Sequence, residues 1–172
     1  MQYSLYLYAL QPTLLSPESL LEKLELIKFI APGDSTQPRL PGANLMDYIT
    51  FLGCSPALQR GEIESVIRLH SAATAFAMGG ESVQTLRYPG CKHPIENVDD
   101  IILQFDQRWR CPQCDNTGEF CDINWRKSAA ISHLFIEVTR VFPKEAVPSD
   151  KLLNFLRQAS ATGWSWFYSR SQ

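Results

Sequence analysis

Residues 132–168 read SHLFIEVTRVFPKEAVPSDKLLNFLRQASATGWSWFY, and this stretch decides the fold class. Its first part, 132–142, alternates apolar and polar side chains, which is typical of a strand with one face on a core. Ser149 suits the N-cap of a following helix, and Gly163 is well placed to end that helix. Residues 164–168 are rich in aromatic side chains and predict a last strand. A strand, a helix and a strand therefore close the chain.

The opposite end of the chain shows the same order of a strand and a helix. Residues 3–9 alternate, with Tyr6 and Tyr8 on a half-exposed face that suits a partner surface. Pro17 follows a serine N-cap, and a helix is expected over Pro17–Phe29. With strands between the two ends, this order predicts an α+β fold. We expect a mostly antiparallel sheet with two helices on one face, in a ferredoxin-like topology.

The middle of the chain is expected to hold shorter elements. Residues 31–44 are rich in proline, glycine and small polar residues, which indicates a loop, and 143–148 are predicted to form another. Residues 45–53 are strongly apolar and fit either a strand or a short helix. Further strands are predicted at 62–70, 83–88, 101–110 and 122–125.

The composition suits one globular domain over residues 1–172, with 45% hydrophobic and 20% charged residues. The formal net charge of -2 gives no strong electrostatic affinity for nucleic acid. The N-terminus has no basic start before an apolar run, and no stretch approaches the length of a membrane span. We therefore expect a cytoplasmic protein that does not contact a membrane.

The five cysteines are the most informative residues for function. An odd number without an export signal argues against a disulfide framework. The motif CPQC at 111–114 spaces two thiolates so that both can reach one ion. Cys91 and His93 follow a Pro-Gly bend, at a distance along the chain typical of a second ligand pair. The predicted ligands of one structural Zn²⁺ in a closed tetrahedral shell are Cys91, His93, Cys111 and Cys114.

This pattern resembles the paired turns of a zinc ribbon over residues 88–126. The resemblance implies a small metal-stapled insertion and no particular activity, because such modules occur in proteins of many functions. Cys121 could replace His93 as the fourth ligand, since it lies shortly past Cys114. The alternative without a metal is a set of buried or free thiols.

These features predict a non-catalytic accessory or protein-interaction domain, with an unidentified protein or a second copy of the chain as its partner. One alternative is a metal-dependent, deaminase-like hydrolase, because His93 and Glu96 precede a Cys-x-x-Cys pair, although their spacing departs from that pattern. A second alternative is an accessory protein that binds single-stranded nucleic acid on its tryptophans. The basic residues near them are Arg108, Arg110, Arg126 and Lys127.

Two further candidates have ordinary structural interpretations. Cys54 lies in a Gly/Pro turn and could act as a nucleophile beside a histidine, but a small apolar core position suits it better. His133 and Glu137 lie four residues apart on one expected strand and could form a dyad. A solvent-facing position on the strand suits both of them better.

Overall fold

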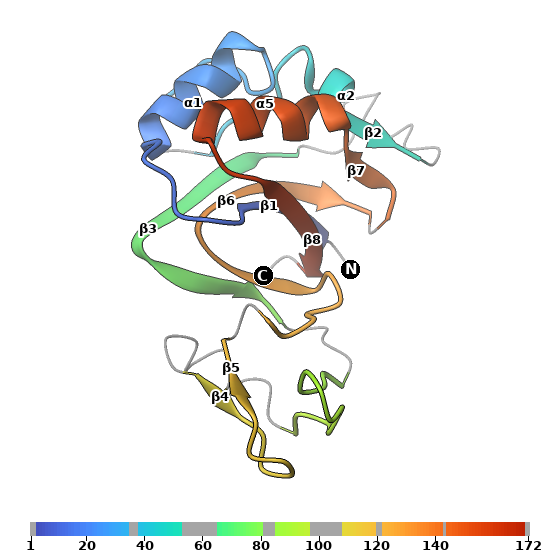
Figure 1. Cartoon of the computed structure of the whole chain (residues 1–172). Coiled ribbons are helices and arrows are strands. Elements are labelled where there is room, and N and C mark those ends of the chain that lie inside the picture. Colours follow the sequence, from blue (N-terminus) through green and yellow to red (C-terminus); the bar gives the residue numbers. More distant parts are fainter. Residues whose placement is uncertain are drawn as a thin grey trace.

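A computed structural model describes residues 3–34, 38–52, 65–80, 85–96, 108–119, 122–142 and 144–170 of the chain. It is an α+β structure, as predicted, with helices on one face of a four-stranded antiparallel sheet (Figure 1). A small two-stranded lobe lies at the other end of the molecule from the helices (Figure 1). Cys54 and Cys121 lie outside the described residues.

The main sheet is built from four strands in the order β3-β6-β1-β8. They are β1 (Tyr3–Ala9), β3 (Ile67–Gly79), β6 (Ala129–Val141) and β8 (Trp164–Arg170). Each pair of neighbours is antiparallel. Because β1 pairs with β8 along its whole length, the first and last strands of the chain lie side by side.

Two helices, α1 (Pro17–Leu26) and α5 (Asp150–Ser160), connect strands of this sheet. Both begin at the predicted caps. The hydroxyl groups of Ser16 and Ser149 each accept a hydrogen bond from a backbone N–H of the first turn, which satisfies a donor that the helix itself leaves free. The sequence signals for the helix starts are therefore confirmed.

The predicted ends of both helices are wrong. α1 stops at Leu26 rather than Phe29, because Lys28 takes a left-handed conformation with φ of 58°, outside the range of a right-handed helix. α5 is closed by Ala161, which is left-handed at φ of 56°. Gly163, the predicted end, belongs instead to the connection into β8.

The main core lies between the helices and the sheet. The buried leucines of α1 and α5 pack in one cluster with the inward side chains of β1 and β6. Nine of its members, each at most 3% exposed, are Leu5, Leu7, Leu20, Leu24, Leu134, Ile136, Val138, Leu152 and Leu156. Each such side chain contributes on the order of 2 kcal/mol when it is removed from water.

Residues 45–53 contain both of the predicted alternatives. The short helix α2 (Leu45–Tyr48) leads directly into β2 (Ile49–Phe51). β2 pairs antiparallel with β7 (Ala146–Pro148), so the prediction of a loop over 143–148 is wrong in its second half. Ala146 is fully buried in the main core, which explains why this part of the connection is ordered as a strand.

Two predicted strands of the middle region are confirmed where the structure describes them. β3 begins at Ile67, inside the expected strand 62–70, and continues well past it. β4 (Trp109–Arg110) forms the end of the expected strand 101–110. β4 leads directly into the first cysteine of the CPQC motif, as the sequence suggested.

In three other segments, the residues that the structure describes form no regular strand. Residues 122–125 are irregular, so the strand predicted there is wrong. Their apolar side chains, Ile123 and Trp125, are buried without a strand. In the expected strand 83–88, Arg87 makes an isolated bridge with Pro94. The described part of 31–44 is irregular apart from isolated bridges, as predicted for a loop.

The face of the sheet away from the helices is also packed. Tyr6, Phe135 and Phe167 belong to a buried cluster on it, and the rings of Tyr6 and Phe167 stack with centroids 5.0 Å apart. Tyr6 is only 7% exposed, so the expected half-exposed face of the first strand is wrong at this position. Gly79, at the end of β3, approaches Phe167 so closely that a side chain would not fit between them.

Candidate metal centre

The small lobe follows β3 and precedes β6 in the chain, and we define it as the described residues 85–96, 108–119 and 122–128. Its strands β4 and β5 (Thr117–Gly118) form a hairpin (Figure 1). The lobe has a hydrophobic cluster separate from the main core, made of Leu86, Ile95, Trp109, Cys111, Ile123, Trp125 and Ala129. Because Ala129 is the first residue of β6, the lobe is attached to the sheet at this point.

Trp109 fixes the hairpin in this cluster. Its indole N–H donates to the Glu119 carbonyl oxygen at 2.7 Å. Its ring lies so close to Gly118 that any Cβ there would come within 2.4 Å of it. The Tyr88 ring packs against it with centroids 5.5 Å apart. These contacts hold the strand that leads into Cys111.

Two tight turns present the cysteines. In the first turn, the Tyr88 N–H donates to the His93 carbonyl oxygen at 3.0 Å, and Cys91 lies between these residues. In the second turn, the Cys111 N–H donates to the Asn116 carbonyl oxygen at 2.8 Å. A backbone hydrogen bond therefore closes each turn. The turn can hold its cysteine side chains in place without support from a long strand.

The thiols of Cys91, Cys111 and Cys114 meet between the two turns. Their sulfur atoms all lie within 4.8 Å of one another, and those of Cys91 and Cys111 are 3.4 Å apart. Sulfurs bound to one zinc ion at about 2.3 Å would lie roughly 3.8 Å from each other, so the group has the right size for a single ion. Cys111 is buried, whereas Cys91 is exposed. The three cysteines could therefore hold a metal ion that solvent reaches from the Cys91 side.

Backbone hydrogen bonds bias the protonation of these sulfurs. A bond from the backbone of His93 is the main cause that lowers the pKa of Cys91, and the Cys114 thiol adds to it. The backbone of Asn116 lowers the pKa of Cys114, but the Cys91 thiol, burial and Cys111 together raise it, and the net shift is upward. The Cys91 thiol therefore loses its proton more readily than the Cys114 thiol, and a bound cation would favour the thiolate form of both residues.

Three of the four predicted ligands meet, and the structure does not bring the fourth to them. Among the described residues, the ligand group contains no histidine. The His93 ring instead stacks on Tyr88, with centroids 6.5 Å apart and planes at 11°. The alternative in which Cys121 completes the shell falls outside the described residues and stays a prediction.

The residue that sequence reasoning missed in this site is Tyr88. The signal was present, because RYPGC at 87–91 matches RCPQC at 110–114 at three of five positions. The two segments form the two turns described above, with Tyr88 in the position that corresponds to Cys111. A search for pairs of cysteines overlooks such a repeat, since one of the four positions holds a different residue.

A second cluster of titratable side chains surrounds Glu137 on the face of the sheet away from the helices. One carboxylate oxygen accepts hydrogen bonds from the hydroxyls of Ser4 (2.7 Å) and Tyr6 (3.1 Å). The other lies 2.9 Å from His70 Nε2 and 3.5 Å from the Arg68 guanidinium. Glu137 is 5% exposed, so its predicted solvent-facing position is wrong.

These partners determine the charge of Glu137. Burial raises the pKa of the carboxyl, but the hydrogen bonds from His70, Ser4 and Tyr6 and the charge of His70 outweigh it and lower the pKa from 4.5 to about 2. Burial and the Glu137 charge raise the pKa of Tyr6 in turn. At neutral pH the cluster therefore holds a charged carboxylate with its donors in place, which is a structural arrangement rather than a free base.

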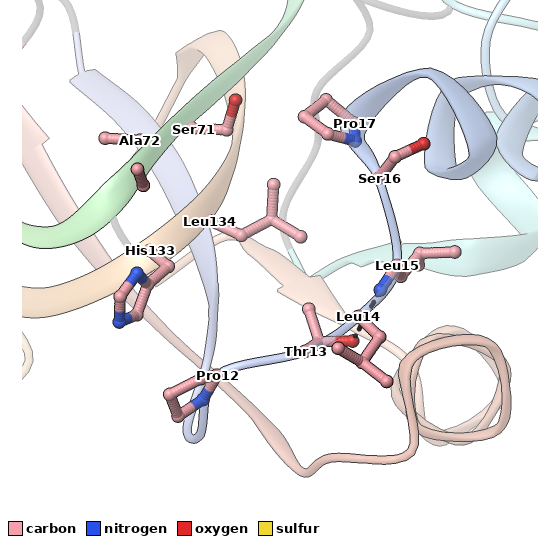
Figure 2. A pocket seen from close by; sticks show the side chains of 11 residues that line it. Pro12, Thr13, Leu14, Leu15, Ser16, Pro17, Ser71, Ala72, His133 and Leu134 are labelled. Atoms are coloured by element: carbon pink, nitrogen blue, oxygen red, sulfur yellow. Dashed lines mark hydrogen bonds between the residues drawn. The ribbon is translucent and has the colours of Figure 1, made fainter.

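A pocket of about 650 Å³ opens beside the loop 12–17. Figure 2 shows this loop across from Ser71 and His133 of the sheet. The hydroxyl of Thr13 is already engaged, because it donates to the Ser160 carbonyl oxygen at 2.8 Å. His133 lines this pocket, whereas the hydrogen-bond partners of Glu137 are those given above, so these two residues are not brought together as the dyad considered from the sequence.

Three of the four basic residues beside the tryptophans have local partners. Arg108 and Arg110 each pair with an acidic side chain of the lobe, at 3.6 and 3.0 Å. The Lys127 ammonium lies 4.3 Å from the centre of the Trp166 ring. Both arginine pairs are exposed to solvent, so they reduce the free positive charge of the lobe only in part. In the part of the chain that the structure describes, no helix has both the length and the apolar surface needed to cross a bilayer.

The chemistry of this site has to be inferred from its own residues. No protein-family model matches the chain, and neither the curated proteins nor the solved structures contain a match to it. What is shown is a group of three cysteines, on two turns of an α+β protein, that could hold a metal ion.

Proposed function

We propose that this protein is a non-catalytic, zinc-binding accessory domain, in which one ion on Cys91, Cys111 and Cys114 shapes the small lobe for contact with another protein or a second copy of the chain. The observation that carries the proposal is the convergence of three sulfurs within 4.8 Å from two separate turns. Cysteine thiolates are common ligands of zinc in tetrahedral sites, and the CPQC spacing is typical of turns that bind zinc. Such a site requires reduced thiols, in keeping with a cytoplasmic location.

The small size of the lobe supports a structural role for the ion. Its cluster of buried side chains is separate from the main core, and Cys111 is itself a member of that cluster. Segments this short seldom bury enough apolar surface to fold alone, and a metal commonly supplies the missing free energy. The ion would thus connect the hairpin to the preceding turn.

A deaminase-like enzyme has less support. In that chemistry a glutamate beside the metal moves protons. Glu96 is exposed, and the ligand group among the described residues contains no carboxylate. The pocket of about 650 Å³ is lined by the loop 12–17 and by residues of β3 and β6, none of which belongs to the lobe.

Binding of single-stranded nucleic acid also has less support. A binding groove needs positive charge that is free to face the phosphates, together with open aromatic faces. Arg108 and Arg110 are paired with acidic residues, and Lys127 covers Trp166. Trp109 and Trp125 are buried in the cluster of the lobe.

We further propose that the chain combines a ferredoxin-like domain with a zinc-ribbon insertion at about 88–126. The strand order β3-β6-β1-β8 supports the first part, because α1 lies between β1 and β3 in the chain and α5 between β6 and β8, as in a split β-α-β arrangement. The position of the lobe between β3 and β6 supports the second part.

Metal analysis of the purified protein tests this function. We expect about one zinc per chain for the unmodified protein, and loss of that zinc in Cys111→Ser, because two thiolates and one hydroxyl bind the ion far more weakly than three thiolates. The thermal midpoint of unfolding should fall in the same variant. Cys54→Ser, which keeps the three clustered cysteines, serves as the control and should retain the metal. A full complement of zinc in Cys111→Ser would refute the assignment.

A further inference from the structure

The two turns that carry the cysteines share the same pattern of backbone hydrogen bonds. Tyr88 and Cys111 hold the same place in them, because each accepts a hydrogen bond on its carbonyl oxygen from the residue four positions on, Lys92 (3.2 Å) and Asp115 (3.0 Å) respectively. Lys92 and Asp115 are both left-handed, with φ of 62° and 58°. The backbone hydrogen bonds and the sequence repeat thus give the same alignment of the two turns.

This alignment locates the position that lacks a cysteine in the described part of the ligand group. Cys91 in the first turn corresponds to Cys114 in the second, and both sulfurs are in the ligand group. Cys111 is in the group as well, and its counterpart is Tyr88. A fully symmetric pair of turns would place a fourth sulfur on residue 88, which is the geometry of a closed tetrahedral site.

The Tyr88 side chain is not shaped to take the place of that sulfur. Its ring packs against the rings of His93 and Trp109, with centroids 6.5 and 5.5 Å apart. The phenol oxygen lies at the far end of this ring, well beyond the point that a cysteine sulfur would reach. Cys91, next to this place, is exposed to solvent.

We infer that a metal ion bound by the three cysteines keeps one exchangeable coordination position beside Tyr88, which takes a small monodentate nitrogen or sulfur donor from outside the chain. The inference rests on the proposed metal site and adds a ligand-binding function to it. Water fills the position when such a donor is absent, as in zinc sites with three protein ligands.

Replacing zinc with cobalt(II) allows the coordination position to be followed by absorption spectroscopy. The absorption spectrum of a cobalt–thiolate site depends on the number and type of its ligands. In the unmodified protein, added imidazole should shift the cobalt absorption bands in a saturable manner. Tyr88→Cys should close the site, so that the sulfur-to-cobalt band grows by about one third, from three thiolates to four, and imidazole has no further effect. Tyr88→Phe, which keeps the ring and removes its oxygen, should respond to imidazole like the unmodified protein.

The possible outcomes separate this inference from the proposed function. One outcome is that the unmodified protein binds cobalt but its absorption bands do not shift with imidazole. If the bands then shift in His93→Ala, Cys121→Ser or Tyr88→Phe, the side chain removed in that variant fills the position in the unmodified protein. The inference is then overturned, while the metal site stands. If cobalt does not bind, both proposals fail. A spectrum that changes with protein concentration supports the inference and identifies a second copy as the source of the donor.

Discussion

Glu137 places a negative charge inside the packed face of the sheet, which is tolerated only because donors surround it. An unpaired buried carboxylate would shift its pKa upward and lose its charge. Here the hydroxyls of Ser4 and Tyr6 and the imidazole of His70 supply the hydrogen bonds that water would otherwise provide. Arg68, which lies opposite Glu137 on β3, adds a positive charge. The carboxylate thereby connects β1, β6 and β3.

Glu137→Gln should destabilise the protein, and the loss should depend on pH. At neutral pH we expect the free energy of unfolding to fall by about 2 kcal/mol, since the amide cannot accept from all of these donors and carries no charge. The folded-state pKa of Glu137 lies below its usual 4.5, at about 2. Its contribution is therefore complete above pH 4.5 and is lost as the pH falls towards 2. Urea unfolding of both proteins across this range measures the difference, which should shrink in acid.

Glu22→Gln is the matched control for this experiment, because Glu22 is an exposed glutamate on α1. Its free energy of unfolding should stay within about 0.5 kcal/mol of that of the unmodified protein at every pH. A Glu137→Gln difference that is constant from neutral pH down to pH 2 would contradict the proposed role of the charge.

Some of the site residues were predictable from the sequence and others were not. The spacing of Cys111 and Cys114 predicts a shared ion whatever the fold around them, because the turn between them is local. The place of His93 depends on how its ring packs against Tyr88, which spacing does not determine. Glu137 looked like a solvent-facing strand residue, because its partners come from other strands whose register is not visible in the sequence.

At the scale of elements, two glycines differ in how much space surrounds them, and the sequence does not show this difference. Gly79 ends β3 with φ of 90°, and Gly90 lies in the first cysteine turn with φ of 87°. Both conformations disfavour any other residue. A Cβ on Gly79 would lie 2.4 Å from the Ser128 carbonyl oxygen, whereas a Cβ on Gly90 would meet only the Asn116 side chain at 3.6 Å.

Alanine at these two positions should therefore have unequal effects. Gly90→Ala should cost about 1 kcal/mol, which is the strain of a left-handed alanine. Gly79→Ala should cost about 3 kcal/mol or more, because β3 must also move away from β6 and from Phe167. Unfolding in urea, followed by circular dichroism with zinc present, compares the two variants. Equal losses would mean that the close approach at Gly79 relaxes without cost.

The helices and β7 also show which features of the fold local sequence signals can predict. The starts of α1 and α5 were predictable because Ser16 and Ser149 act on their own first turns. Their ends depend on the left-handed conformations of Lys28 and Ala161, which the residue types lysine and alanine do not predict. β7 was missed because a three-residue strand exists only through its pairing with β2, far away in the chain.

At the scale of the whole molecule, the main core and the cluster of the small lobe differ in size and position. The main core joins α1, α2 and α5 to the sheet and contains residues from both ends of the chain. The cluster of the small lobe contains fewer side chains and shares Ala129 with the start of β6. Since the three cysteines lie in the lobe, the proposed metal should stabilise the lobe far more than the sheet.

Removal of the metal should therefore loosen the molecule locally. After treatment with a chelator, hydrogen exchange should accelerate at the amides of Tyr88 and Cys111, whose bonds close the two turns. Amides of α5 and of β1 should keep their protection, because their burial does not depend on the lobe. The first residues of β6 should fall between these extremes, as they belong to both parts of the structure. Mass spectrometry of peptides from labelled protein resolves the three regions, and restored zinc should reverse the change. Uniform acceleration along the chain would mean that the ion supports the entire fold, and unchanged exchange in the lobe would mean that the three thiols hold it in shape without an ion.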